Sequence, residues 1–296
     1  MQTDHGLILL DGGMGQELRK RSQQPASPLW SAQVMLDEPQ LVVDSHRAYI
    51  AAGAEVITTN NYTATPQRLA RDGDPNGFAA LHKAALRAAH EAASTSDRRV
   101  RVAGCLPPLV ASYHADQVPD ELTCRRDYTR LVETQRDAVD LFIAETMSLT
   151  REAVAATRAG KQSGLPVWTA LTVDDHDGGQ LRSGEPLADA AQAVVAAGAD
   201  AVLINCSAPE AVTTAMPILA RVGVPFGGYA NGFEAAAELK PGGMVDGLKA
   251  RESLTPERYV EHVEGWVEAG ASLIGGCCEI GPAHIQALSQ RFRYKR

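Results

Sequence analysis

The chain contains 296 residues, of which 45% are hydrophobic and 22% are charged, as is typical of a globular protein with a sizeable core. Its net charge is −8 and no basic stripe is visible, so we expect no binding to nucleic acid. The sequence has no run of about 18 apolar residues and no N-terminal basic segment followed by an apolar one. This pattern predicts a cytoplasmic protein without a membrane span or a signal peptide.

Eight short apolar runs recur along the chain and predict eight β-strands. Each run is nearly continuous in apolar character, which is typical of strands buried on both faces in a parallel sheet. In chain order the expected strands are residues 7–13, 54–60, 100–106, 141–147, 166–173, 201–207, 225–231 and 272–279.

Segments rich in Ala, Leu, Arg and Glu lie between the strands and predict helices, most clearly over residues 77–94 and 126–139. Another helix is expected to begin after Thr255, whose side chain can cap the first turn while Pro256 takes the first helical position. The phrase Ala-Gly-Ala precedes three of the strands, and its glycine suits a left-handed helix C-terminus. These glycines are Gly53, Gly198 and Gly270.

The alternation of strands and helices predicts the fold. Eight strand–helix units close a (β/α)8 TIM barrel, and a doubly wound open sheet is the alternative. The count of eight favours the barrel, as does the gathering of polar residues at the strand ends. No linker or low-complexity stretch interrupts the pattern, so we expect residues 1–296 to form a single domain.

Three of the five cysteines stand at the ends of predicted strands. Cys206 ends the sixth strand, and Cys277 and Cys278 end the eighth, so that their thiols can converge above a barrel. Three thiolates with an open fourth position are typical of a catalytic zinc site, whereas a structural site usually has a fourth protein ligand. Spacing alone leaves open that all three are small buried apolar residues, which is what we expect of Cys105 and Cys124.

Two carboxylates, Asp11 and Glu145, end the first and fourth strands. An ionised carboxylate in an apolar strand needs compensation, which a substrate ammonium group or an internal Lys or Arg would supply. The two groups could also serve as general acid and base, as in a lyase or hydrolase whose cysteines are structural. A non-catalytic thiol- or metal-binding protein is a further alternative.

Seven short segments occur in an order that is characteristic of one enzyme family. They are residues 11–14 (DGGM), 29–32 (LWSA), 59–65 (TNNYTAT), 144–146 (AET), 205–206 (NC), 229–232 (YANG) and 275–278 (GGCC). Together they resemble the homocysteine S-methyltransferase family over essentially the whole chain. The Asn-Cys and Gly-Gly-Cys-Cys motifs are the most specific of the seven.

The resemblance implies an enzyme of methionine biosynthesis in which a zinc-bound thiolate of L-homocysteine attacks the methyl group of a cationic donor. Cys206, Cys277 and Cys278 would hold Zn²⁺, and the substrate sulfur would take the fourth position. A free thiol has a pKa of about 8.5 and is mostly protonated at neutral pH, whereas a metal-bound thiol loses its proton. Glu145 and Asp11 would bind the ammonium group of homocysteine.

The same resemblance implies further substrate-binding residues. Backbone N–H groups near Gly13 and Met14 would meet the homocysteine carboxylate, where the Gly12-Gly13 pair lets the backbone come close to an anion. Thr59 is expected to contact the substrate, and Asn231 to orient the zinc site or the substrate. The protein would act as a monomer or a small homo-oligomer.

The methyl donor is expected to be a sulfonium or a quaternary ammonium compound. Trp30 and Tyr62 would form aromatic walls around its positive charge, with cation–π contacts worth about 0.5–2 kcal/mol each. Residues 29–32 and 61–66 look most like the S-methylmethionine-using enzymes, so S-methylmethionine is the expected donor. However, residues 104–113 (GCLPPLVASY) replace the Gly-Ser-x-Gly-Pro run expected after the third strand, which leaves betaine and dimethylsulfoniopropionate as alternatives.

Overall fold

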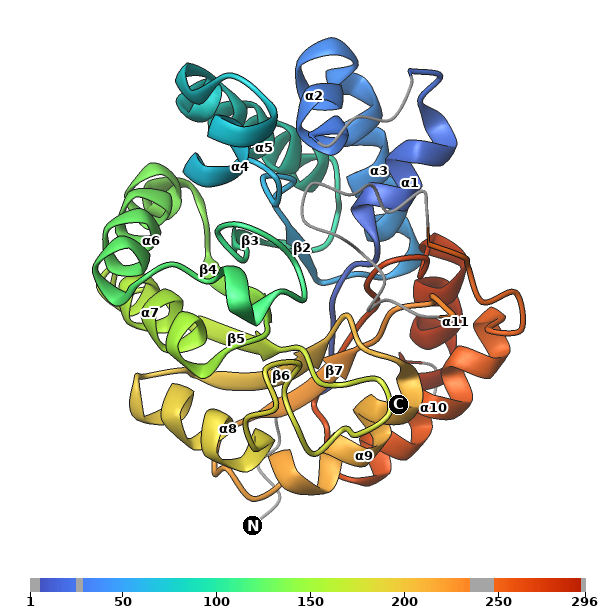
Figure 1. Ribbon diagram of the computed structural model, residues 1–296. Coiled ribbons are helices and arrows are strands. Elements are labelled where there is room, and N and C mark those ends of the chain that lie inside the picture. Colours follow the sequence, from blue (N-terminus) through green and yellow to red (C-terminus); the bar gives the residue numbers. More distant parts are fainter. Residues whose placement is uncertain (1–5, 25–28, 235–247, 294–296) are drawn as a thin grey trace.

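The computed structural model describes residues 6–24, 29–234 and 248–293. Within them, eight parallel strands form a barrel that is surrounded by helices (Figure 1). The strands are β1 (Ile8–Leu9), β2 (Val56–Thr58), β3 (Arg101–Leu106), β4 (Leu141–Met147), β5 (Val167–Leu171), β6 (Ala201–Asn205), β7 (Phe226–Tyr229) and β8 (Leu273–Ile274). Their order is β1-β8-β7-β6-β5-β4-β3-β2, and a parallel bridge from Leu10 to Val56 closes the ring. The predicted (β/α)8 TIM barrel is thus confirmed.

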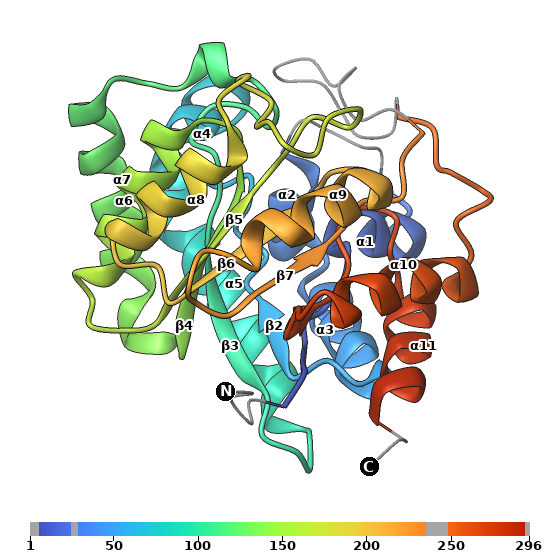
Figure 2. The same ribbon diagram turned by 90° about the horizontal axis from the view of Figure 1, so that it is seen from below.

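The helices of the described residues pack outside the strands, as the view turned by 90° also shows (Figure 2). They are α1 (Met14–Arg21), α2 (Trp30–Asp37), α3 (Pro39–Ala52), α4 (Pro66–Asp72), α5 (Phe78–Ser94), α6 (Glu121–Gln135), α7 (Thr150–Lys161), α8 (Leu187–Ala196), α9 (Pro209–Leu219), α10 (Pro256–Glu268) and α11 (Pro282–Arg293). None of them is long and apolar enough to cross a membrane.

The backbone confirms several predicted helix ends. Gly53, Gly198 and Gly270 have φ angles of 120°, 106° and 102°, in the left-handed region that glycine adopts without steric strain. Thr255 accepts a hydrogen bond from the N–H of Arg258 at 3.4 Å and so caps α10. These ends turn the chain from each helix into the following strand, which keeps the barrel units short.

Helix α6 differs from the predicted span of residues 126–139. It begins at Glu121, because Asp120 accepts a hydrogen bond from the N–H of Thr123 at 2.8 Å and caps the first turn. It ends at Gln135, and a short 3-10 helix (Arg136–Ala138) follows. The prediction was therefore wrong by one turn at the N-terminal end, where the cap rather than apolar periodicity decides the start.

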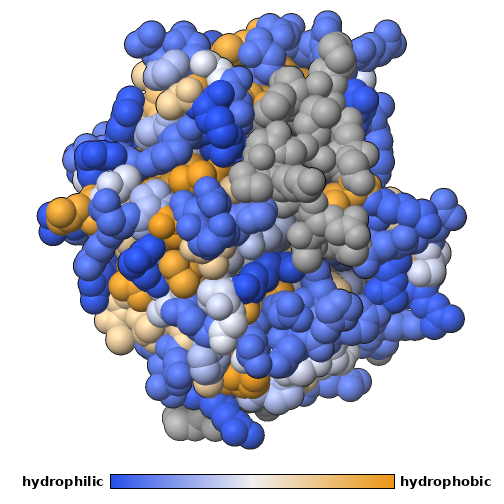
Figure 3. Space-filling model, viewed as in Figure 1, coloured by the Kyte–Doolittle hydropathy of each residue, from blue (hydrophilic) through white to orange (hydrophobic). Residues whose placement is uncertain are grey.

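Apolar side chains pack in two layers. The larger layer fills the space between the strands and the helices. The smaller layer lies inside the barrel and includes Leu10 and Tyr229, which also form part of the floor of a pocket at the C-terminal ends of the strands. Because the barrel interior is filled, a substrate can bind only above this layer. On the face seen in Figure 3, hydrophilic residues predominate and hydrophobic ones occur in small groups.

Candidate active site

The strands open at their C-terminal ends into a pocket with about 1190 Å³ of empty space, part of it open to solvent. Most of the predicted site residues line it, namely Asp11, Gly13, Met14, Thr59, Tyr62, Glu145, Cys206, Cys277 and Cys278. Trp30 begins α2, but its side chain lies outside the part of the molecule that the structure describes. The pocket thus brings together residues from both ends of the chain.

The three predicted ligand cysteines converge. Their Sγ atoms all lie within 4.8 Å of one another, and those of Cys206 and Cys278 are 3.7 Å apart. A tetrahedral metal with metal–sulfur bonds of about 2.3 Å separates its sulfur ligands by about 3.8 Å. The three thiols therefore fit a soft metal ion, for which they would supply three ligands at the pocket wall.

The thiol of Cys206 differs electrostatically from the other two. Hydrogen bonds from the thiols of Cys277 and Cys278 hold the pKa of Cys206 well below its usual value, and the Tyr113 hydroxyl adds to this effect. Cys206 also has a φ angle of 52°, which is uncommon for a residue other than glycine. Such strain persists only where the surroundings fix the backbone, and it is frequent at functional sites.

Asn205, the first residue of the Asn-Cys motif, ties two strands together beneath the thiols. Its Oδ1 accepts a hydrogen bond from the N–H of Thr146 at 2.8 Å, and its Nδ2 donates to the Thr146 hydroxyl at 2.9 Å. The same Nδ2 lies 3.9 Å from the Sγ of Cys277. Asn205 therefore positions the end of β4, where Glu145 lies, relative to the cysteines.

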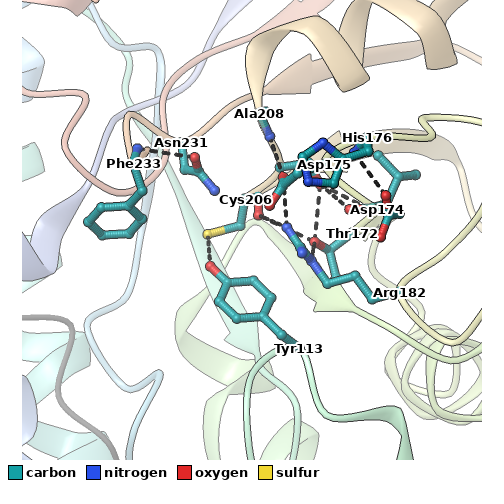
Figure 4. A network of polar contacts seen from close by, with 12 residues as sticks. Tyr113, Thr172, Asp174, Asp175, His176, Arg182, Cys206, Ala208, Asn231 and Phe233 are labelled. Atoms are coloured by element: carbon teal, nitrogen blue, oxygen red, sulfur yellow. Dashed lines mark hydrogen bonds and ion pairs between the residues drawn. The ribbon is translucent and has the colours of Figure 1, made fainter. Parts of the chain in front are cut away.

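Tyr113 and Arg182 support Cys206 from the side (Figure 4). The Tyr113 hydroxyl lies 2.9 Å from the Cys206 Sγ, and the Arg182 guanidinium stacks 4.5 Å from the centre of the Tyr113 ring. Arg182 also donates to the Cys206 carbonyl at 3.3 Å and forms an ion pair with Asp175 at 2.9 Å. Sequence reasoning missed both residues, because they lie in loops where no periodic pattern marks them.

Asp11 and Glu145 are both buried in the pocket wall. Burial raises the pKa of Asp11 to about 8, and the charge of Glu145 adds to this, although the Thr58 N–H that donates to Asp11 at 2.8 Å opposes it. Burial likewise raises the pKa of Glu145 to about 7. Neither carboxyl forms a salt bridge with a Lys or Arg of the described residues. This leaves them free to pair with a cation from the pocket.

Cys105 is buried as predicted, but it does more than fill space. Its Sγ donates a hydrogen bond to Oε1 of Glu145 at 3.0 Å, while the Tyr229 hydroxyl donates to Oε2 at 3.3 Å. The two donors hold the Glu145 carboxyl in one orientation. Cys124, the other cysteine expected to be structural, is fully buried in α6.

The backbone near Gly13 changes one expectation. The Gly13 N–H donates to the carbonyl of Ile280 at 3.0 Å, so it is already engaged and cannot meet a substrate carboxylate. The pocket is also lined by Met14, Gly15 and Gln16, the first turn of α1. The N–H groups of a first helical turn lack intrahelical partners and attract anions. Of the two residues expected to meet a carboxylate, Met14 therefore lies in a turn with unpaired N–H groups, while Gly13 lines the pocket with its N–H already bonded.

Asn231 is buried but is not part of the pocket lining. Its Oδ1 accepts a hydrogen bond from the N–H of Phe233 at 3.2 Å, and its Nδ2 has no partner among the described residues. Figure 4 shows this amide nitrogen on the side facing Cys206. Asn231 therefore lies next to Cys206 and outside the pocket lining.

A closed parallel barrel that gathers three thiols and two buried carboxyls at the C-terminal ends of its strands has the arrangement of an enzyme active site. The sequence matches the model of the homocysteine S-methyltransferase family over residues 8–292, and the chain belongs to this family of methyltransferases. It is 30% identical to the homocysteine S-methyltransferase of Escherichia coli (strain K12), covering 96% of this chain and 95% of that protein.

Other relatives and solved structures agree with this assignment. The chain is 30% identical to a selenocysteine methyltransferase of Astragalus bisulcatus, covering 95% of this chain and 90% of that protein. The crystal structure of the homocysteine methyltransferase MmuM from Escherichia coli in its metallated form superposes with a TM-score of 0.81. The two are 28% identical, and the match covers 97% of each chain.

Proposed function

We propose that the protein transfers a methyl group from a small cationic donor to the thiol of L-homocysteine and produces methionine, with Zn²⁺ held by Cys206, Cys277 and Cys278. The convergence of the three thiols at the open end of the barrel carries this proposal. The existence of a metallated form of MmuM supports it. Zinc suits three thiolates because it is a borderline-soft ion without redox chemistry.

The metal, when bound, would supply the acidity that keeps the homocysteine thiol deprotonated at neutral pH. The carboxyls of Asp11 and Glu145 would bind the ammonium group of the same substrate, which favours their ionised form. The first turn of α1 would accept the homocysteine carboxylate. These contacts hold the thiol in place, and orientation of this kind contributes a large part of catalysis.

The donor side of the pocket would be formed by Tyr62, together with Trp30. Tyr62 is anchored by a hydrogen bond of 2.8 Å between its hydroxyl and that of Ser112. An aromatic wall binds a sulfonium or quaternary ammonium group better than the neutral product. When the methyl group moves, a carbon–sulfur bond forms on homocysteine, the bond to the donor breaks, and the donor keeps its electron pair and leaves as a neutral group. S-Methylmethionine is the proposed donor, and betaine and dimethylsulfoniopropionate are the alternatives.

The remaining proposals concern supporting residues and assembly. Thr59 lies at the pocket wall, where its hydroxyl donates to the side chain of Asn61 at 2.6 Å, and we assign it a positioning role. The Nδ2 of Asn231, which faces Cys206, would help to orient the zinc site. We further propose that residues 1–296 form one domain in the cytoplasm and act as a monomer or a small homo-oligomer, which sedimentation of the purified protein would test.

The test combines metal analysis with a donor panel. The purified protein should contain about one zinc ion per chain and should form methionine from homocysteine and at least one of the donors S-methylmethionine, dimethylsulfoniopropionate, betaine and S-adenosylmethionine. Cys277→Ala should lose both zinc and turnover, whereas Cys124→Ala, a buried cysteine outside the pocket, should keep both. Full activity of Cys277→Ala would refute the proposal.

A second acceptor can be included in the same assay. Selenocysteine methyltransferases are among the relatives at 28% to 30% identity. A selenol ionises more readily than a thiol and would fit the same open position. Turnover of selenocysteine at a higher kcat/KM than that of homocysteine would reassign the acceptor without changing the site.

A further inference from the structure

Arg68 lies on α4 with its side chain at the donor side of the pocket. The residue is only 8% exposed and belongs to the pocket lining. Its backbone is fixed, because its N–H donates at 3.2 Å to the Thr65 hydroxyl that caps α4, and the same hydroxyl donates to the Leu109 carbonyl at 2.6 Å. The guanidinium is therefore held in one region of the wall.

The guanidinium has polar contacts but no counter-ion. Its Nε and Nη2 donate to the Pro108 carbonyl at 3.4 and 3.2 Å, and Nη2 also lies 3.5 Å from the Ser112 hydroxyl. The group stands over the Tyr62 ring, 5.2 Å from its centre. Among the described residues, no carboxylate forms a salt bridge with Arg68, and Nη1 donates to no polar atom.

The charge of Glu152 acts on Arg68, but the two side chains form no salt bridge, and the buried Oε2 of Glu152 has no hydrogen-bond partner among the described residues. Its Oε1 accepts hydrogen bonds from the Leu109 N–H and the Tyr128 hydroxyl, both at 3.0 Å, and its side chain is not part of the pocket lining. A buried cation without a paired anion is energetically costly. Arginine binds carboxylates through two parallel hydrogen bonds, which would use its free Nη1.

We propose that Arg68 binds the carboxylate of the methyl donor, so that the enzyme selects zwitterionic donors, in which the onium group and a carboxylate belong to one molecule. This inference rests on the proposed function, since it specifies the second substrate of the same reaction. It assigns a counter-ion to the buried Arg68 guanidinium, which forms no salt bridge with any described residue.

The residues between Arg68 and the thiols form a continuous wall. The Tyr62 ring contacts the guanidinium and its hydroxyl contacts that of Ser112, and Tyr113, which follows Ser112, reaches Cys206. A donor whose carboxylate pairs with Arg68 therefore has its cationic end among the two tyrosine rings, directed toward the thiols. Homocysteine would instead occupy the side of Asp11, Glu145 and α1.

The loop over residues 104–113, which departs from the family pattern, also helps to position Arg68. The Pro108 carbonyl, within residues 104–113, accepts two of the three hydrogen bonds that hold the guanidinium, and Ser112 of the same segment accepts the third. Proline fixes its own φ angle and so restricts the direction of the neighbouring carbonyls. The Pro107-Pro108 pair thus places Arg68 against the pocket, which links the unusual loop to donor selection.

The test compares donors with and without a carboxylate at saturating homocysteine. In Arg68→Met, kcat/KM should fall about 30-fold or more for S-methylmethionine and dimethylsulfoniopropionate, because a buried charge pair is lost. Trimethylsulfonium, which lacks a carboxylate, should change less than about 3-fold, and the KM of homocysteine should stay the same. Arg71→Met on the same helix is the matched control, since Arg71 pairs with Asp72 and the Val110 carbonyl.

Two results would overturn the inference. An equal loss for all donors would assign Arg68 a structural role only, and a selective rise in the homocysteine KM would place it in the acceptor site. If wild-type protein forms no methionine from any donor, including trimethylsulfonium, the proposed function itself fails.

A measurement on the wild-type protein covers the case in which Arg68→Met does not fold. Inhibition by 3-(methylthio)propionate, the product of dimethylsulfoniopropionate, should be at least about 10-fold stronger than inhibition by its methyl ester. Equal inhibition constants would contradict carboxylate binding. Arg68→Lys should restore part of the preference, because lysine keeps the charge but loses the bidentate geometry.

Discussion

Replacing Asp11 by Asn should make the protein more stable and a poorer enzyme. The Asn side chain can still accept the hydrogen bond from the Thr58 N–H. It carries no ionisable proton, however, and the pKa of Asp11 is raised from 3.8 to about 8, mainly by burial. Between these two pH values the unfolded Asp11 is ionised while the folded one keeps its proton.

The sign and size of the effect follow from this difference. Because the folded state binds the extra proton, the free energy of unfolding of the wild type falls as pH rises from about 4 to about 8. Each pH unit between 3.8 and 7 contributes about 1.4 kcal/mol, so Asp11→Asn should gain at most about 4 kcal/mol at pH 7. The gain should be smaller at pH 5 than at pH 7 and should vanish below pH 4.

Urea denaturation at pH 5 and pH 7, at matched metal content, measures this gain. Asp44→Asn, at a partly exposed position on α3, is the control and should change the free energy of unfolding by less than about 0.5 kcal/mol. A difference between Asp11→Asn and the wild type that does not grow with pH would refute the reasoning. The KM of homocysteine should rise about 10- to 100-fold, since the amide no longer pairs with the ammonium group.

Substitutions at three further positions probe the site and the barrel. Cys105→Ala removes the donor to Glu145 and should raise the KM of homocysteine about 3- to 10-fold in steady-state assays, whereas Cys105→Ser should resemble the wild type. Tyr113→Phe should lower kcat/KM about 10-fold without loss of zinc, as metal analysis would show; loss of zinc would contradict a positioning role. Gly227→Ala should give no folded protein by circular dichroism, because its Cβ would lie 1.7 Å from a carbonyl oxygen of β8.

The barrel and the convergence of its strand ends could be predicted from the sequence, because apolar runs and helix caps are local signals. The strand lengths could not. The run over residues 7–13 yields only Ile8–Leu9 as β1, although the backbone stays paired as far as Asp11, whose N–H donates to the Val56 carbonyl at 3.1 Å and whose carbonyl accepts from the Gly276 N–H at 2.9 Å. Beyond it the chain leaves the sheet, and the Gly13 N–H donates to the Ile280 carbonyl instead. Apolar character alone does not mark this point.

The supporting residues of the site were harder to predict. Tyr113 and Arg182 reach Cys206 from loops whose paths depend on tertiary contacts, as the left-handed φ of 68° at Tyr113 illustrates. The contact between Cys105 and Glu145 is different. The two residues lie near the C-terminal ends of β3 and β4, which are neighbours in the sheet, so their proximity could have been inferred from barrel topology.

The barrel wall is shortest where β1 pairs with β8, so a ligand bound at the ends of these strands can stabilise the whole fold. Strands β1 and β8 contribute two residues each, and beyond the Leu10–Val56 bridge the Asp11 side chain continues the connection to Thr58. A ligand that spans Asp11 and the cysteines after β8 would connect the ends of these two short strands. Its binding energy would then add to global stability, by about 2.7 kcal/mol at a concentration of 100 times Kd. Ligand binding and the stability of the barrel would therefore be thermodynamically linked.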